Sequence, residues 1–102
     1  MIARTWRGWT AAEHADRYYE YLLETGVRAY SETPGNRGVH VLRRVEGDRA
    51  EFLLVTFWES MDGVRAFAGN DPERAVFYPE DERFLVDHDK QVKHYEVLDS
   101  QK

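Results

Sequence analysis

The stretch Ala50 to Ser60, AEFLLVTFWES, is a run of apolar and β-branched residues that ends in a Trp-Glu-Ser sequence. A near-continuous apolar run of this kind is typical of a strand that is covered on both faces. We therefore expect it to be the central strand of one sheet. Because side chains alternate along a strand, the run divides into two faces, Leu54, Thr56 and Trp58 on one and Leu53, Val55 and Phe57 on the other.

Three other segments also have the two-residue period of a strand. Side chains alternate over residues 2–8, 39–45 and 91–98. The Gly-containing turn at residues 46–49 makes the second of these the antiparallel neighbour of the central run.

A helix is predicted between the first two strands. Thr10 and Glu13 have the spacing of a capping box, which satisfies the free N–H groups at a helix start. The apolar face that follows consists of Ala15, Tyr18, Tyr19 and Leu22. Gly26 is expected to end this helix, and a further helical turn would point Tyr30 inward.

The residues after the central run predict a second helical region. Ser60 is expected to cap a helix over residues 61–68, and Asp71-Pro72 to begin a turn or helix that stops at Tyr78-Pro79. Residues 79–90 show no regular pattern. The order is therefore β-α-β-β-α-β, which predicts an α+β, ferredoxin-like antiparallel sheet with its helices on one face.

Length and composition limit the function classes. At 102 residues the chain fits one domain, expected at residues 1–98, with a loose tail at residues 99–102. The net charge of −5 provides no basic surface for nucleic acid, and no apolar window is long enough to span a membrane. The absence of cysteine excludes thiolate chemistry and fits a reducing cytoplasm, where we expect the protein to act.

The helices of such a fold cover only one face of the sheet. The other face would carry Leu42, Leu53, Val55, Phe57, Tyr95 and Val97, which are too apolar to remain in water. We therefore predict that this face is buried against a second copy of the chain in a homodimer.

Several segments resemble the antibiotic biosynthesis monooxygenase superfamily of dimeric α/β barrels. They are MIARTW, the long capped helix after it, TPGNRGVHVLRR, the strand end FWES and RAFAGNDPERAV, and they are spread over nearly the whole chain. The resemblance is most specific at Trp58-Glu59-Ser60 and the Phe67, Gly69 and Asp71-Pro72 that follow. It implies a homodimer, a pocket between sheet and helices, and, in some members, oxygenation of phenols without flavin or metal.

The chain departs from the residue patterns of two groups in that superfamily. Where the quinone-forming enzymes place an amide, a tyrosine and an arginine, this chain has Leu54, Val64 and Tyr78, so only the tryptophan at position 58 is shared. Haem-degrading members use an asparagine, a tryptophan and a histidine, and the corresponding positions here hold Trp6, Phe67 and Phe77. Since Phe77 cannot ligate iron, the resemblance does not favour haem degradation.

The candidate site lies on the predicted helix-covered face. We expect a small aromatic or apolar ligand to contact Arg4, Trp6, Leu54, Thr56, Trp58, Phe67 and Tyr78. Arg4 and Trp58 are the candidates for catalysis, because a guanidinium can hold an anion and an indole N–H can donate to a carbonyl or phenol. Two simpler roles stay open: Trp58 as a packing residue, and Arg4 in a salt bridge to one of the glutamates at positions 20, 24 and 96.

No metal or cofactor is expected. The histidines at positions 14, 40, 88 and 94 include no pair at the i, i+4 spacing of a helical metal site. Any one of them could accept a proton, and His40 and His94 are the better candidates because strands hold them. The trio Glu80-Asp81-Glu82 is interpreted as solvated, because adjacent carboxylates usually lack the burial that raises a pKa.

Three functions remain open from the sequence. The first is a cofactor-independent monooxygenase that acts on an aromatic or apolar metabolite. The second is a non-catalytic ligand-binding or stress-response module of the same fold. The third is a cofactor-free isomerase or lyase, in which a histidine and Arg4 would move a proton on a lactone or enol.

Overall fold

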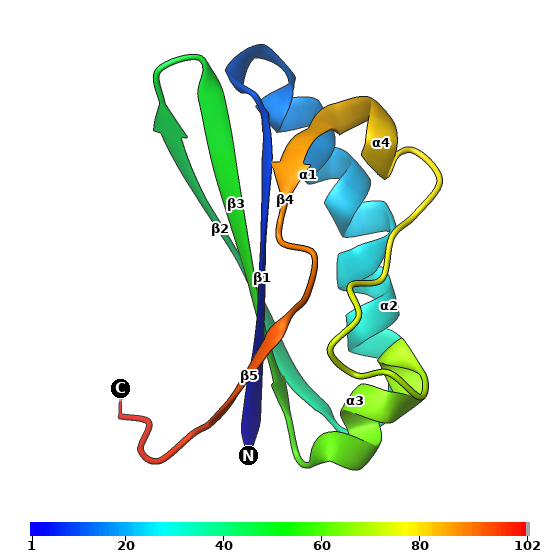
Figure 1. Cartoon of the computed structure of the whole chain (residues 1–102). Coiled ribbons are helices and arrows are strands. Elements are labelled where there is room, and N and C mark those ends of the chain that lie inside the picture. Colours follow the sequence, from blue (N-terminus) through cyan, green and yellow to red (C-terminus); the bar gives the residue numbers. More distant parts are fainter. Residues whose placement is uncertain (102) are drawn as a thin grey trace.

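The computed structural model describes residues 1–101, and its described strands form one sheet with the helices on a single side (Figure 1). In chain order the elements are β1 (Ile2–Ala11), the 3-10 helix η1 (Ala12–His14), α1 (Ala15–Glu24), α2 (Gly26–Glu32), β2 (Asn36–Glu46), β3 (Arg49–Trp58), α3 (Met61–Ala68), α4 (Asp81–Phe84), β4 (Leu85–His88) and β5 (Lys93–Glu96). Residues 99–101 have no regular structure, and position 102 of the expected tail lies outside the described residues.

The sheet has the ferredoxin-like order β2-β3-β1-β4, and every pairing is antiparallel. The predicted fold class is therefore confirmed, with β3 in the interior of the sheet. The last strand is divided, because β4 and β5 both pair with β1 along the same edge. The register slips between Trp9 and Thr10, where β4 pairs with β1.

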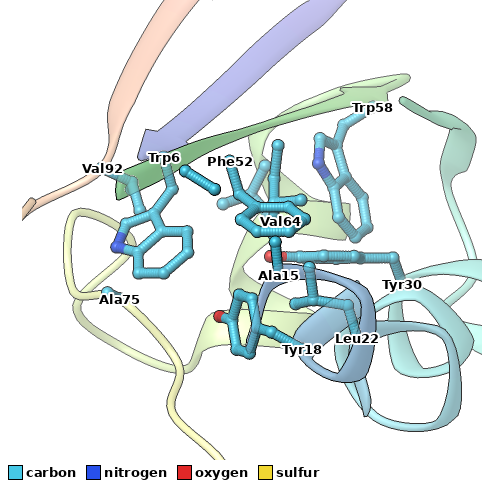
Figure 2. Close-up of a cluster of buried hydrophobic side chains, with 12 residues drawn as sticks. Trp6, Ala15, Tyr18, Leu22, Tyr30, Phe52, Trp58, Val64, Ala75 and Val92 are labelled. Atoms are coloured by element: carbon cyan, nitrogen blue, oxygen red, sulfur yellow. The ribbon is translucent and has the colours of Figure 1, made fainter. Parts of the chain in front are cut away.

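The two faces of β3 divide as the alternation predicts. Leu54, Thr56 and Trp58 face the helices and are at most 4% exposed. β1 adds Arg4 and Trp6 to this face, since Arg4 pairs with Thr56 and Trp6 with Leu54. Figure 2 shows the resulting core, in which Trp6, Phe52 and Trp58 project from the sheet toward Tyr18, Leu22 and Tyr30 of the helices.

The opposite face of the sheet is not covered within the chain. Leu42 is 49% exposed and Tyr95 is 52% exposed, while Leu53, Val55 and Phe57 are half-buried by their neighbours on the sheet. Apolar side chains thus gather on a surface that no helix of the described chain reaches.

The start and end of the first helical region differ from the prediction. Thr10 does not cap a helix: it is buried in β1, and its hydroxyl donates to the carbonyl of Ala11. The ladder with β3 continues to the pair Ala11 and Arg49, so backbone pairing prevails over the local capping signal. The break falls at Thr25, and Gly26 begins α2 instead of ending α1. Tyr19, predicted to face the sheet, is 42% exposed.

The segment between α3 and α4 has the turn, and not the helix, of the two alternatives predicted from Asp71-Pro72. Residues 70–80 form turns and extended chain, and the N–H of Arg74 donates to the carbonyl of Asp71. Backbone pairing explains the absence of a helix, because Val92 donates to the carbonyl of Glu73 and Arg74 bridges to Gln91. Further along, α4 and β4 lie in the part where the sequence shows no regular pattern.

Ser60 caps α3 as predicted, since its hydroxyl accepts from the N–H of Asp62. No helix within residues 1–101 combines the length and the apolar character needed to cross a bilayer.

Candidate active site

A small cavity lies between the sheet, α1, α2 and the irregular segment before α4. Its volume is about 20 Å³, close to the space that one water molecule occupies. The lining residues are Arg4, Trp6, Tyr18, Leu22, Gly26, Tyr30, Leu54, Ala75, Val76, Tyr78, Asp81 and Val92. Four of the seven expected ligand contacts are among them, namely Arg4, Trp6, Leu54 and Tyr78.

Arg4 brings a buried positive charge to this cavity. Its side chain is 2% exposed, its Nη2 donates to the carbonyl of Arg74 at 3.1 Å, and its Cζ lies 5.6 Å from the ring centre of Phe67. The Nε–H is buried without a hydrogen-bond partner. None of the ion pairs within residues 1–101 includes Arg4, so the salt bridge left open by the sequence is not formed.

Burial disfavours the charged form of the Arg4 guanidinium. Desolvation lowers the pKa of Arg4, and the nearby Tyr30 phenol opposes that shift. Arginine nevertheless keeps its proton in proteins, so the cavity wall carries a cation that forms no ion pair within residues 1–101.

Three phenols lie around the same cavity. Burial raises the pKa of Tyr18 and of Tyr30 above the ordinary value, and it raises the pKa of Tyr78 to about 12. All three therefore remain neutral at ordinary pH and retain an O–H that can donate to an anion. Tyr30 was expected to point inward, and it is 6% exposed.

Asp81 is the functional candidate that the sequence interpretation missed. The trio Glu80-Asp81-Glu82 was expected to be solvated, but Asp81 is only 5% exposed and lines the cavity. Its Oδ2 accepts from the N–H of Tyr78, three residues earlier in the chain, at 2.6 Å. No signal in the sequence indicated this burial, because the three acids are adjacent and only the fold buries the middle one.

A wider groove lies beside the cavity. It has a volume of about 650 Å³ and is lined by Phe77, Tyr78, Pro79, Asp81, Glu82, Leu85 and His88. Tyr78 and Asp81 line both spaces, so they form the wall between them.

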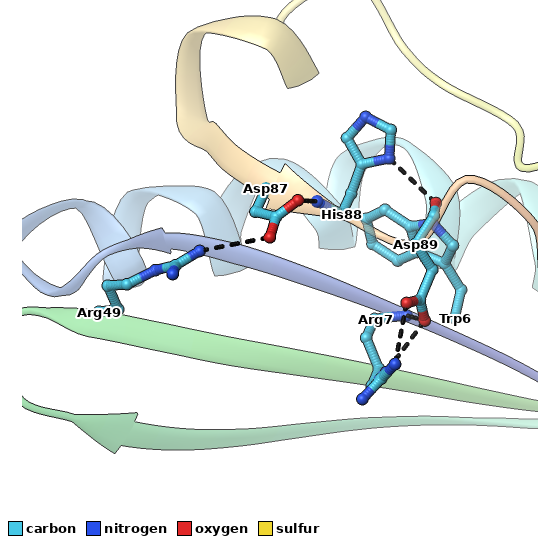
Figure 3. A network of polar contacts seen from close by, with 6 residues as sticks. All are labelled: Trp6, Arg7, Arg49, Asp87, His88 and Asp89. Atoms are coloured by element: carbon cyan, nitrogen blue, oxygen red, sulfur yellow. Dashed lines mark hydrogen bonds and ion pairs between the residues drawn. The ribbon is translucent and has the colours of Figure 1, made fainter.

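His88, which lines the groove, belongs to a network of polar contacts with Trp6, Arg7 and Asp89 (Figure 3). The Nδ1 of His88 lies 2.9 Å from the carbonyl oxygen of Asp89, which also accepts from the Nε1 of Trp6 at 3.1 Å. The carboxylate of Asp89 binds Arg7 on the outer face of the sheet. Trp6 is thus held in one orientation between cavity and groove.

The remaining expected contacts, Thr56, Trp58 and Phe67, do not line the cavity. Trp58 is fully buried, and its Nε1 donates to the hydroxyl of Thr56 at 2.8 Å. The ring of Phe67 packs between Trp58, Tyr30 and the Arg4 guanidinium. These residues therefore lie outside the lining, and Phe67 packs against the lining residues Tyr30 and Arg4.

The histidines preferred as bases are not in the cavity lining. His94 pairs with Arg4 across β5 and β1, and its Nε2 is buried without a partner. Burial and the charge of Arg4 lower the pKa of His94, so its ring is neutral. His40 packs against Phe57 on the outer face of the sheet. Within residues 1–101, no three or more histidine and acidic side chains gather as a metal would require.

The sheet order and the helices on one face define an α+β domain of the ferredoxin-like class. The chain matches the family described as antibiotic biosynthesis monooxygenase over residues 1–77, and it belongs to that family. Tyr78 and Asp81 lie just beyond the matched residues. No curated protein matches the chain.

Solved structures share this fold at low sequence identity. A Bacillus cereus protein assigned to the antibiotic biosynthesis monooxygenases is 15% identical, with a TM-score of 0.70 over 99% of this chain and 96% of that one. A Deinococcus radiodurans protein with the same assignment is 14% identical, with a TM-score of 0.66 over 100% of this chain and 97% of that one. MhuD from Mycobacterium tuberculosis, a haem-degrader with two haems bound in its active site, is 20% identical, with a TM-score of 0.60 over 98% of this chain and 99% of that one.

Proposed function

We propose that this protein is a cofactor-independent monooxygenase that binds a small phenolic aromatic compound in the cavity between sheet and helices. The observation that supports it is Arg4, a buried guanidinium with a free Nε–H and no acidic partner within residues 1–101. A buried, unpaired charge destabilises a protein, so a bound anion would be strongly favoured there.

The surroundings of Arg4 fit a phenolate. Neutral phenols of Tyr18, Tyr30 and Tyr78 can donate to the oxygen or stack on the ring, and Trp6 and Leu54 provide apolar walls. In a site that excludes water, the attraction between the guanidinium and a phenolate is stronger than in solution.

The reaction needs no reductant other than the substrate. The phenolate form of the substrate is electron-rich and passes an electron to O₂, and the two radicals then combine. One oxygen atom becomes the new carbonyl oxygen of a quinone, and the other leaves as water with two substrate hydrogens. The role of Arg4 is to hold the substrate as the anion that starts this sequence.

The cavity must enlarge to admit an aromatic ring, since it now has room for one water molecule. The segment of residues 70–80 is the part that can move, because it contains no helix or strand. Displacement of Tyr78 would join the cavity to the groove, since its side chain lines both.

Haem does not fit the residues of the cavity. Its lining contains no histidine, cysteine or methionine, and its tyrosines resist ionisation, which ligation of iron by a tyrosinate requires. The groove does contain His88, but Asp81 and Glu82 beside it would repel the haem carboxylates. Titration with haemin is therefore expected to give no shifted Soret band.

We further propose that the working unit is a homodimer formed through the outer face of the sheet. The exposed apolar side chains on that face, Leu42 and Tyr95 among them, support this assembly. Sedimentation at micromolar concentration is expected to show a dimer, and a single monomer-sized species would contradict the proposal.

Oxygen uptake is the direct test of the activity. The protein is incubated with naphthols and hydroxyanthracenes, and O₂ consumption and quinone formation are followed together. Arg4→Gln should lower uptake by at least about 100-fold, because anion stabilisation of this kind contributes that much or more. Arg28→Gln is the matched control, since Arg28 is an exposed arginine on α2.

The same experiment separates the other two functions. Tight binding of a phenol with no turnover would support a binding module. Exchange of a substrate proton with solvent, without O₂ uptake, would support an isomerase or lyase. Either result would contradict the monooxygenase proposal.

A further inference from the structure

Asp81 is a buried carboxylate in the lining of the cavity. It is the first residue of α4, is 5% exposed, and lines the cavity that Arg4 also lines. Because it also lines the groove, a ligand entering past Tyr78 would pass this carboxylate.

The carboxylate is held in place but is not neutralised. Its Oδ2 accepts from the N–H of Tyr78 at 2.6 Å, and the hydroxyl of Tyr18 approaches it from α1. No ion pair within the described residues includes Asp81. The carboxylate is therefore held by the backbone and by a neutral hydroxyl, and no cation in residues 1–101 pairs with it to neutralise it.

The surroundings make this carboxylate more basic than an ordinary one. Burial raises the pKa of Asp81, although the Tyr78 N–H, the charge of His88 on β4 and the Tyr18 hydroxyl oppose the shift. The phenols of Tyr18, Tyr30 and Tyr78 face it from α1, α2 and its own loop, and all three are neutral. A buried base of raised pKa removes a proton more effectively near neutral pH than a solvated carboxylate does.

We propose that Asp81 is the general base of this site and takes the proton of a bound phenol whose oxygen is received by Arg4. This inference rests on the proposed function, because it requires that Arg4 hold a phenolate. The phenol O–H bond breaks, the proton passes to a carboxylate oxygen of Asp81, and the electron pair stays on the phenol oxygen. The cavity then holds a neutral carboxylic acid and a phenolate beside the guanidinium, so its total charge is unchanged.

The roles of the two charged residues are thus complementary. Arg4 stabilises the anion, and Asp81 determines where the proton goes. Without Asp81 the proton would have to leave for solvent across a wall that Tyr78 helps to close.

The test uses 4-nitrophenol, whose phenolate has a visible absorption band that its neutral form lacks. Binding is measured about one pH unit below the pKa of the free phenol, where ionisation of the bound form must be caused by the site. Calorimetry in two buffers of different ionisation enthalpy gives the number of protons exchanged with solvent. The variants are Asp81→Asn, which keeps an oxygen for the Tyr78 N–H, and Glu20→Gln, which removes an exposed carboxylate of α1.

Wild type and Glu20→Gln should bind 4-nitrophenol as the phenolate with almost no proton released. Asp81→Asn should bind it as the neutral phenol, or as the phenolate with about one proton released to the buffer. Its rate of oxygen uptake with naphthols should fall about 100-fold or more, which is the usual contribution of a general base. A phenolate bound by Asp81→Asn without proton release would overturn the assignment.

Infrared difference spectroscopy tests the same step in the wild type, whether or not Asp81→Asn folds. A carbonyl band of a protonated carboxyl group should appear when 4-nitrophenol binds, and absence of that band with a bound phenolate would overturn the role of Asp81. If wild type binds only the neutral phenol, both this inference and the proposed role of Arg4 fail. If it binds the phenolate without forming the acid, only this inference fails.

Discussion

Substitution of Trp58 tests whether this residue serves packing or ligand binding. Its indole N–H donates to the Thr56 hydroxyl at 2.8 Å, and both groups are buried. Trp58→Phe removes this donor and leaves a buried hydroxyl without it, at a cost of about 1–3 kcal/mol. The smaller ring also leaves a void beside Tyr30 and Phe67, whose ring centres lie 6.3 and 6.0 Å from that of Trp58, and adds about 1 kcal/mol.

We therefore expect Trp58→Phe to lower the free energy of unfolding by about 2–4 kcal/mol, a substantial part of the 5–15 kcal/mol typical of a domain. Urea unfolding followed by far-UV circular dichroism measures this loss without depending on tryptophan fluorescence. Thr56→Val removes the other partner of this hydrogen bond. The double variant should lose about 1 kcal/mol less unfolding free energy than the two single variants lose in sum.

Ligand affinity provides the decisive comparison. Because the indole N–H is already used and Trp58 does not line the cavity, Trp58→Phe should bind 4-nitrophenol within about twofold of wild type. A tenfold loss of affinity with unchanged stability would show that the indole contacts the ligand, and it would refute this reasoning.

Two further predictions concern packing and pH. Gly8→Ala should lower the free energy of unfolding, measured with urea, by about 1–3 kcal/mol, because a Cβ there would lie 2.5 Å from Cη2 of Trp6 and 3.0 Å from Leu85. Unchanged stability would show that the tryptophan can move aside. Stability should also fall between about pH 10 and pH 12 in thermal unfolding, because burial raises the pKa of Tyr78 from 10.0 to about 12. Folding favours the neutral phenol of Tyr78, so its contribution to stability is complete below the pKa of the unfolded state and is lost as the pH rises through the pKa of the folded state. Tyr78→Phe should therefore weaken the loss of stability at alkaline pH. An equal loss in that variant would contradict the assignment to Tyr78.

The alternation along the central strand was enough to predict which side of the sheet holds the cavity. A strand places every second side chain on one face, so the orientation of Leu54, Thr56 and Trp58 followed from position alone. The sheet order places β1 beside β3 and so predicted that Arg4 and Trp6 lie near Thr56 and Trp58, whereas the register that pairs Arg4 with Thr56 came from the structure.

The parts that the sequence did not predict depend on contacts between distant segments. Asp81 is buried because α4 folds back over the cavity and its carboxylate binds the Tyr78 N–H, which composition cannot show. The partner of the Trp58 indole also required coordinates, since a strand-end tryptophan can donate to a ligand or to a neighbour with equal ease. The choice between turn and helix in residues 70–80 depends on backbone pairing between Glu73 and Val92, a contact that is remote in sequence.

Part of the cavity lining lies on paired strands and part in a segment without regular structure, and this difference affects how the binding site could evolve. Arg4, Trp6 and Leu54 stand on paired strands, whereas Ala75, Val76 and Tyr78 come from a segment without helix or strand. Substitutions or length changes in that segment would reshape the space offered to a ligand and leave the strand pairing intact. New substrate preferences could therefore evolve in residues 70–80 while the sheet that holds Arg4 stays constant.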